Sequence, residues 1–119
     1  MILRPCRAID MVHFTKWHLP ERYAGIVCEE DGELIGLGAI IIGDKKRPWV
    51  VLDVTPRMRE KKVTLLRVGR LLVELGVGQF GKVYVMRDQR EPRSKEWLER
   101  LGFRETGEVY RGEIVMEAG

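Results

Sequence analysis

Basic residues form the strongest concentration of chemistry in this 119-residue chain, although its formal net charge is only +3. The stretch from Asp44 to Arg70 holds nine basic residues against three acidic ones, which are Asp44, Asp53 and Glu60. The basic residues are Lys45, Lys46, Arg47, Arg57, Arg59, Lys61, Lys62, Arg67 and Arg70. Such a stretch can meet phosphate groups on a small molecule or on a nucleic acid. A solvated rim without any ligand is the alternative, and the pattern alone leaves both open.

Asp53 is a second candidate, because it is the one charged residue in the apolar run Trp49–Thr55. A carboxylate among apolar neighbours is partly desolvated, which is a common setting for catalytic proton acceptors. Amine chemistry needs such a group, since an ammonium ion cannot attack an electrophile before it loses a proton. The alternative is an edge-facing or ion-paired Asp without a catalytic role.

Other kinds of site find little support in the residue pattern. His13 and His18 are five positions apart and lack neighbouring metal ligands, so we expect no metal site. Gly36-x-Gly38 lacks the third glycine and the following helix of a dinucleotide-binding motif.

The cysteine pattern indicates the compartment. Cys6 and Cys28 form no CxxC pair and lie in apolar stretches, where free thiols behave as small hydrophobic residues. A reduced pair suits the cytoplasm. No segment approaches the roughly 20 apolar residues that cross a bilayer, and the first ten residues lack the apolar core of a secretory signal. We therefore expect a cytoplasmic protein without a membrane partner.

Hydrophobic periodicity and turn residues predict an alternation of strands and helices. The predicted strands are Ile2–Pro5, Tyr23–Glu30, Glu33–Ile42, Trp49–Thr55, Lys82–Met86 and one or two within Glu108–Glu117. The predicted helices are Ala8–His18, Arg59–Val77 and Pro92–Leu101.

Turn residues mark the element boundaries. The Asp31-Gly32 pair predicts a tight hairpin, and Pro56 ends the strand before it. Gly36 and Gly38 indicate a bulge or a close approach of another element, and Gly76 or Gly78 is expected to close the long helix.

The element order is β-α-β-β-β-α-β-α-β. A strand, a crossover helix and a further strand imply a central parallel pair, whereas the hairpin is antiparallel. We expect an α/β fold with a mixed, twisted sheet of about six strands and helices on both faces. The length suits one domain, residues 1–119.

The segment from Trp97 to Gly107, which reads Trp-Leu-Glu-Arg-Leu-Gly-Phe-Arg-Glu-Thr-Gly, resembles the C-terminal half of GNAT N-acetyltransferases. Members of that family typically carry a helix ending in Tyr-Glu-Lys-Leu-Gly-Phe at this place. The segment Glu29–Gly36 is similar to the family's second and third strands. Pro92–Phe103 also resembles short GNAT-like proteins encoded in tailed phages and prophages, which implies a bacterial or phage source.

This resemblance implies a binding site for acetyl-CoA. In the family, the pantetheine arm enters a gap between the fourth and fifth strands, and the pyrophosphate binds amides at the start of the next helix. The resemblance places Val54 against the pantetheine arm and Asp53 as the general base. The pyrophosphate site falls on Arg59, Lys61, Lys62, Val63 and Thr64.

The chain departs from the family pattern at the residues that do the chemistry. Glu60, Lys62 and Thr64 stand where the family loop has glycines, which let backbone approach a phosphate closely. Leu98 stands where many members have a proton-donating tyrosine, and Glu91 replaces an asparagine. Tyr84 is a conceivable substitute for this general acid, and the only ground for it is the alternation of side chains along its strand.

Three functions compete on these grounds. The first is acetyl-CoA-dependent transfer to a primary amine, on a small molecule or a protein. The second is a non-catalytic GNAT-fold module for binding or assembly, related to phage particles. Nucleic-acid binding through the basic stretch is the weakest, because no aromatic interleaving accompanies the charges. The expected state is a monomer or homodimer.

Overall fold

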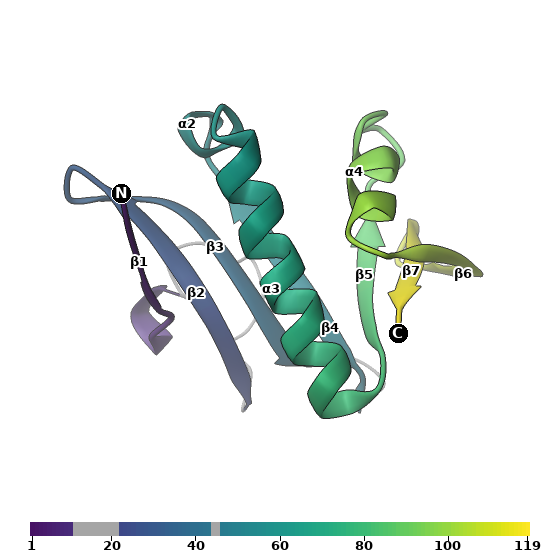
Figure 1. Ribbon diagram of the computed structural model, residues 1–119. Helices are drawn as coiled ribbons and strands as arrows, with labels where there is room; N and C mark the ends of the chain where they lie inside the picture. The colour runs from purple at the N-terminus through teal and green to yellow at the C-terminus, as the bar shows by residue number, and fades with distance from the viewer. Residues whose placement is uncertain (11–21, 44–45) are drawn as a thin grey trace.

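The computed structural model describes residues 1–10, 22–43 and 46–119. Its strands are β1 (Ile2–Pro5), β2 (Tyr23–Glu30), β3 (Glu33–Ile42), β4 (Pro48–Val54), β5 (Val83–Arg87), β6 (Arg104–Tyr110) and β7 (Glu113–Ala118). Its helices are α2 (Pro56–Arg59), α3 (Lys62–Phe80) and α4 (Ser94–Arg100). Figure 1 shows them as one ribbon from the N-terminal strand at the left to the β6–β7 hairpin at the right.

The described strands form one mixed sheet in the order β1-β2-β3-β4-β5-β7-β6. Neighbouring strands are antiparallel except β4 and β5, which are parallel, as expected for a pair joined by a crossover helix. The prediction of a mixed α/β sheet is thus confirmed, with seven strands in place of about six. The extra strand arises because the C-terminal segment folds as a complete hairpin around Arg111 and Gly112, both at positive φ.

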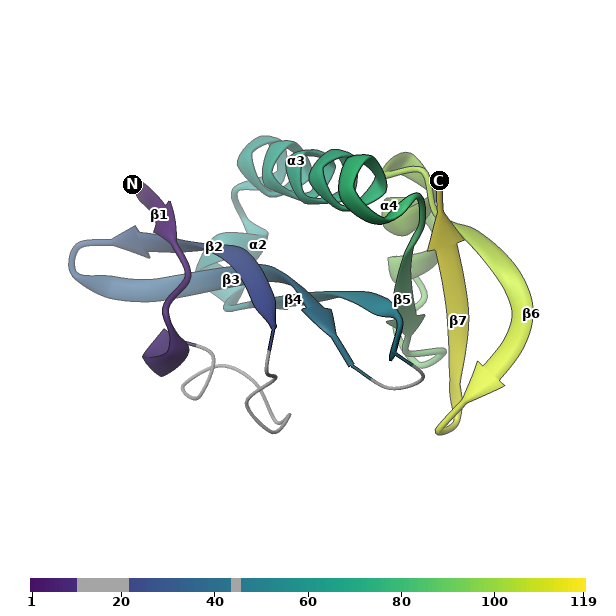
Figure 2. The same cartoon turned by 90° about the horizontal axis from the view of Figure 1, so that it is seen from below.

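Helices α2, α3 and α4 cover one face of the sheet, and the helical turn Ala8–Asp10 lies on the other, as expected for helices on both faces (Figure 2). A side chain on Gly38 would overlap Leu72 of α3, and one on Gly36 would lie 3.1 Å from Met58 of α2. Leu101, directly after α4, lies against Gly69 of α3. The helix expected at Ala8–His18 has its first turn, Ala8–Asp10, in the structure, and the rest lies outside the described residues.

Two apolar clusters fill the two sides of this sheet. The first joins α3 and α4 to the strand residues Ile40 and Val50 and to Phe103, which lies between α4 and β6. The second, on the opposite face, includes Leu37 and Trp49. Because side chains alternate along a strand, this division assigns every β4 residue to one face or the other.

Local signals explain the positions of the turns and of one close approach. Asp31 and Gly32 have φ angles of 52° and 80°, the positive values that the predicted two-residue hairpin requires. Gly38 admits Leu72 of α3, so the predicted close approach is confirmed, and a register shift between Cys28 and Glu29 lies beside the pair formed by Cys28 and Gly36.

The predicted end of the long helix is wrong. Helix α3 runs past Gly76 and Gly78 to Phe80 and is capped by Gly81 at φ 82°. Gly76 is a packing glycine, because a β-carbon there would overlap Val83 of β5. The start also differs from the predicted Arg59: Thr55 and Pro56 begin the separate turn α2, and α3 starts at Lys62.

A buried ion pair ties β1 to the segment after it. The Arg4 guanidinium donates hydrogen bonds of 2.8 and 2.9 Å to the two carboxylate oxygens of Asp10, whose side chain is only 2% exposed. These bonds hold the pKa of Asp10 at about 2. None of the helices in the described part of the chain has the length and apolar character needed to cross a membrane.

Candidate functional site

The central feature of the site is the separation of β4 from β5. Among the described residues the two strands pair at one position, Trp49 with Tyr84. Beyond that point they diverge, and in Figure 1 β4 passes behind α3 while β5 runs apart from it toward α4. The backbone of β4 from Val50 onward is therefore bonded to β3 on one side and open toward β5 on the other.

The diverging strands enclose a cleft of about 320 Å³. Its walls come from the first half of β4, the second half of β5 and the N-terminal part of α4. The lining residues are Trp49, Val50, Val51, Leu52, Val85, Met86, Arg87, Asp88, Glu91, Ser94, Trp97, Leu98 and Glu113. We refer to this space as the strand cleft. Its inner wall is apolar, and its charged residues gather where β5 ends.

The turn after β4 is built by Thr55. Its hydroxyl donates to the carbonyl oxygen of Ile35 at 2.9 Å and accepts from the amide of Met58, which caps α2. Met58 is buried against Gly36, so the turn is fixed to β3. This arrangement puts Arg59 and Glu60 on the surface, where both are exposed.

The N-terminus of α3 offers backbone donors but no acidic residue in its first turn. Its N-cap, Lys61, makes no side-chain capping bond. The first α-helical bond closes from the amide of Leu65 to the carbonyl of Lys61, at 2.9 Å. The amides of Lys62, Val63 and Thr64 precede that bond and are the orphan donors found at any helix start.

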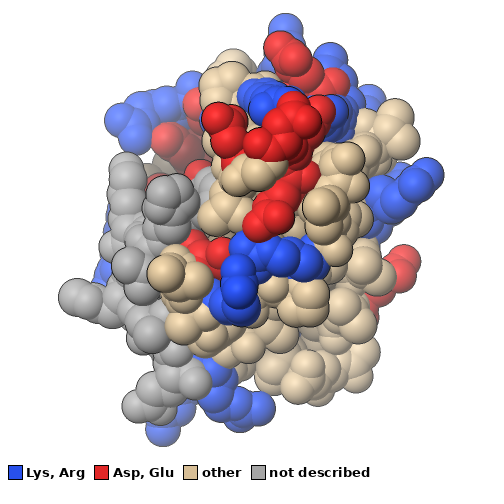
Figure 3. Space-filling model, turned by 90° about the vertical axis from the view of Figure 1, so that its left-hand side faces the viewer, with Lys and Arg blue, Asp and Glu red and all other residues tan. Residues whose placement is uncertain are grey.

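Two of the basic side chains near this helix start turn toward the β2–β3 hairpin. The Lys61 ammonium lies 3.0 Å from Glu30, and the Arg57 guanidinium lies 2.7 Å from Asp31 and 3.4 Å from Glu30. We call this group, with Glu33, the hairpin junction. Figure 3 shows acidic and basic groups side by side over the upper part of the face that contains β1.

The pKa of Glu30 reflects these contacts. The Lys61 ammonium, 3.0 Å from Oε2 of Glu30, and the charge of Arg57 hold this pKa below its usual range, against the opposing effect of desolvation. The charges at the hairpin junction are thus engaged within the protein. Arg47, from the same basic stretch, is likewise paired with Glu108 at 2.8 Å.

Asp53 lies on the diverging part of β4. Val50 and Leu52 face the helices, whereas Trp49 and Val51 belong to the opposite cluster. Alternation therefore puts Asp53 on the face away from α3, where it is half-buried. It is one residue beyond Leu52, the last β4 residue that lines the strand cleft.

The positions considered for a general acid differ in their surroundings. Leu98 lines the strand cleft and is 5% exposed, so an apolar group occupies the wall there. Tyr84 packs in the cluster on the opposite face, and the Arg47 guanidinium carbon lies 4.8 Å from its ring centre. Tyr84 pairs with Trp49, which lies four residues before Asp53 on β4. Along the strand, Tyr84 is therefore about 13 Å from the level of Asp53.

The predicted site residues are therefore only partly brought together. Val54 and the residues from Arg59 to Thr64 follow one another around the end of β4, but none of them lines the strand cleft. Leu98 and Glu91, which do line it, were singled out only as departures from the family pattern, and the end of β5 was not predicted. One signal was present: Arg87 continues the inward positions of Val83 and Val85, so a charge at that place is anomalous.

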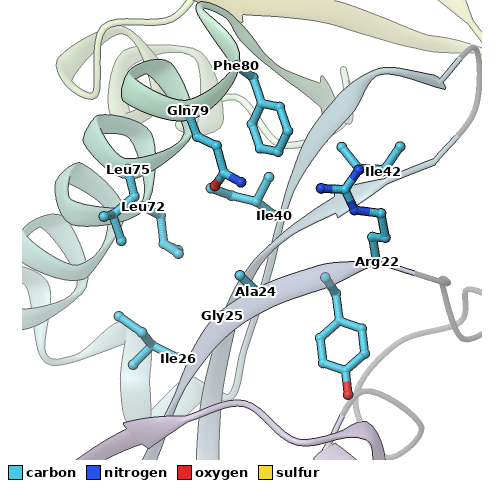
Figure 4. Close-up of a pocket in the computed structure, with 11 residues that line it drawn as sticks. Arg22, Ala24, Gly25, Ile26, Ile40, Ile42, Leu72, Leu75, Gln79 and Phe80 are labelled. Atoms are coloured by element: carbon cyan, nitrogen blue, oxygen red, sulfur yellow. The ribbon is translucent and has the colours of Figure 1, made fainter.

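A second pocket lies on the helical face between α3 and β2 (Figure 4). It has a volume of about 310 Å³. Its walls are mainly apolar, with Ile26, Ile40 and Leu72 among them, and Arg22 and Gln79 supply its polar groups. None of the residues predicted to do chemistry lines it. The described residues contain no group of three His, Cys, Asp or Glu side chains placed to hold a metal ion.

Comparison with known proteins gives matches in structure but none in sequence. No protein-family model matches the chain, and no curated protein does. A variant of the spermidine N-acetyltransferase from Vibrio cholerae is similar with a TM-score of 0.68 and 16% identity, over 99% of this chain and 94% of that one.

Two further solved structures agree. A provisionally assigned GnaT-family acetyltransferase from Bordetella pertussis has a TM-score of 0.65 at 16% identity, over 82% of this chain and 65% of that one. An IAA acetyltransferase from Bacillus cereus has a TM-score of 0.60 at 18% identity, over 82% and 78%. Identities this low establish architecture, and on that basis the chain has the fold of the GNAT acetyltransferases.

Proposed function

We propose that the chain is an acyltransferase that moves an acetyl group from acetyl-CoA to a primary amine. The observation that carries this proposal is the divergence of β4 and β5 after one paired position, which opens the strand cleft. The structural neighbours support it, because their names describe acetyltransferases, including one for spermidine. They give no support to a non-catalytic module.

The residues present are compatible with a CoA thioester. The open edge of β4 offers backbone groups to the amides of an extended arm, and Val54 lies at its end. The start of α3 offers the amides of Lys62, Val63 and Thr64, with Arg59 nearby, to a pyrophosphate. Lys61 would take part only by leaving Glu30. When bound, acetyl-CoA supplies an acetyl group activated as a thioester.

Asp53 is the proposed general base. Its carboxylate would accept a proton from the ammonium group of the acceptor, which frees the nitrogen lone pair. Leu98 cannot give a proton to the departing CoA thiolate, so this proposal assigns that protonation to solvent. Transfer would then depend less on a protein acid than in relatives that carry a tyrosine there.

The test is a binding and transfer experiment on the full chain. Calorimetric titration with acetyl-CoA should show saturable binding, and incubation with spermidine or a lysine peptide should release CoA thiol. Asp53→Asn should retain binding and lose most of the transfer, by roughly 100-fold or more. Absence of binding at millimolar acetyl-CoA contradicts the proposal, and binding without transfer to any amine restores the non-catalytic alternative.

A further inference from the structure

Arg87, the last residue of β5, has an unusual environment. Its side chain is only 10% exposed and it lines the strand cleft. A guanidinium carries five N–H donors. Its Nη2 makes a hydrogen bond of 3.4 Å to Glu105, which is long for a charged pair, and its buried Nε has no acceptor among the described residues.

Glu105 is a weak partner for this charge. Its side chain is 41% exposed, and the oxygen that faces Arg87 also lies 3.7 Å from the Lys95 ammonium. A buried cation with one long, shared contact is costly, because its lost hydration is not replaced. An oxygen acceptor entering the strand cleft would replace it.

Acidic residues line the same end of the cleft, and their state matters for the ligand's charge. Asp88 is engaged with Arg90, whose guanidinium donates to both of its oxygens at 3.1 Å. Glu91 is exposed and Glu113 is half-buried. Among the described residues neither forms an ion pair, so they are the groups that would favour a cation instead. Arg87 differs from these acids because it is a buried cation, and its Nε–H group has no acceptor among the described residues.

We propose that Arg87 binds a phosphate oxygen of the CoA moiety in the strand cleft. The inference rests on the proposed function, which supplies the identity of the ligand. It assigns part of the phosphate recognition to the end of β5. The other part stays at the start of α3, where Lys62 and Thr64 replace two glycines of the family loop. A planar guanidinium suits this role, since two of its N–H groups can reach one phosphate.

The experiment compares Arg87→Gln with Arg93→Gln by calorimetric titration. Both variants lose one positive charge, but Arg93, which directly precedes the lining residue Ser94, is exposed and does not line the cleft. CoA affinity should fall about 10- to 100-fold in Arg87→Gln, the range expected for a charged hydrogen bond, and less than about threefold in Arg93→Gln. Pantetheine, which lacks phosphates, should bind both variants and the wild type equally.

A second measurement separates binding from folding. If Arg87 serves CoA, Arg87→Gln should keep the melting temperature of the free chain or raise it, because a poorly compensated buried charge is removed. Pyrophosphate should raise the melting temperature of the wild type more than that of Arg87→Gln, which keeps the amides at the start of α3. A lower melting temperature with unchanged CoA affinity would mean that Arg87 is a structural partner of Glu105, and the inference would be wrong.

The remaining outcomes also decide. An equal loss for pantetheine would move the contact to the amide arm, and tighter binding of spermidine than of CoA would assign this end of the cleft to the acids; either overturns the inference. Wild-type binding of CoA without transfer, lost in Arg87→Gln, would support Arg87 while the proposed function fails. Transfer that survives in Arg87→Gln with unchanged CoA affinity would support the proposed function and overturn the role of Arg87.

Discussion

The hairpin junction and the strand cleft use positive charge in opposite ways. At the hairpin junction, Arg57 and Lys61 each have a carboxylate at 3.0 Å or less, and one of those carboxylates, Asp31, is 81% exposed. In the strand cleft, Arg87 is nine-tenths buried and its Nε has no acceptor among the described residues. Paired surface charges hold neighbouring elements together, whereas a buried charge with an unsatisfied donor is a candidate contact for a ligand.

This difference shows why a count of charges misleads. The basic stretch is rich because its members include the partners of acids elsewhere in the chain, such as Arg47 with Glu108. Arg87 lies outside that stretch and attracts no attention by composition. Its burial and its single long contact to Glu105 are properties of packing, which only the fold reveals.

The largest expected effect comes from filling the strand cleft. Ser94 is the first residue of α4, is half-buried and lines the cleft, with its hydroxyl donating to the carbonyl of Glu91. Ser94→Trp should place an indole in the cleft and lower CoA affinity by roughly 100-fold or more, which corresponds to about 2.7 kcal/mol. Calorimetric titration measures the change.

Lys95→Trp is the matched control, because Lys95 is the next residue, is exposed and does not line the cleft. It should leave CoA affinity within about threefold, a difference below 1 kcal/mol. Circular dichroism should show that both variants fold. If Ser94→Trp binds CoA as the wild type does, the cofactor does not use the strand cleft.

The sequence predicts the architecture well because local chemistry decides most of it. The Asp31-Gly32 hairpin follows from residues that tolerate positive φ, and the parallel β4–β5 pair follows from the crossover helix. The helix end is predicted wrongly because glycine has two uses that one sequence cannot separate. Gly81 ends α3, whereas Gly76 admits Val83.

The site is predicted less well, since it depends on distances between elements far apart in the chain. The element containing Asp53 is identified correctly, but the face on which Asp53 lies comes from the packing of Val50 and Leu52. The pairing of Lys61 with Glu30 joins residues from α3 and β2 and has no local signal. The roles of Asp53, Val54 and the residues from Arg59 to Thr64 stay predictions.

The packing of α3 at the closed end of the cleft gives an intermediate effect. Gly76 faces Val83 of β5 and Ile40 of β3, whereas Gly78 on the same helix has nothing within 4 Å of a β-carbon. Gly76→Ala should lower the free energy of unfolding by about 1–2 kcal/mol, because the added methyl overpacks the contact. Gly78→Ala should raise it by about 0.5–1 kcal/mol through helix propensity alone.

Urea unfolding of both variants measures these changes. Both substitutions replace a glycine with alanine within the last five residues of α3. Opposite changes in the free energy of unfolding would therefore isolate the packing contribution at Gly76. Equal stabilisation by both would mean that α3 does not approach β5 as closely as Gly76 indicates. The strand cleft would then lack a firm closed end.

The smallest effect is expected at the hairpin junction and appears as a pH dependence. Because Lys61 and Arg57 lower the pKa of Glu30 in the folded state, its contribution to stability is complete above the unfolded pKa of 4.5. It is lost as the pH falls from there through the lower folded pKa. Glu30→Gln should therefore lower the melting temperature slightly at neutral pH and reduce its decline below pH 4.5.

The same variant sharpens the contrast with the strand cleft. High salt, with a Debye length of about 3 Å at 1 M, should reduce the difference in melting temperature between Glu30→Gln and the wild type. CoA affinity should stay the same or rise, since Lys61 is released from Glu30 and becomes available to a phosphate near the start of α3. A fall in CoA affinity would show that the hairpin junction positions the binding residues, and the two regions would then form one functional unit.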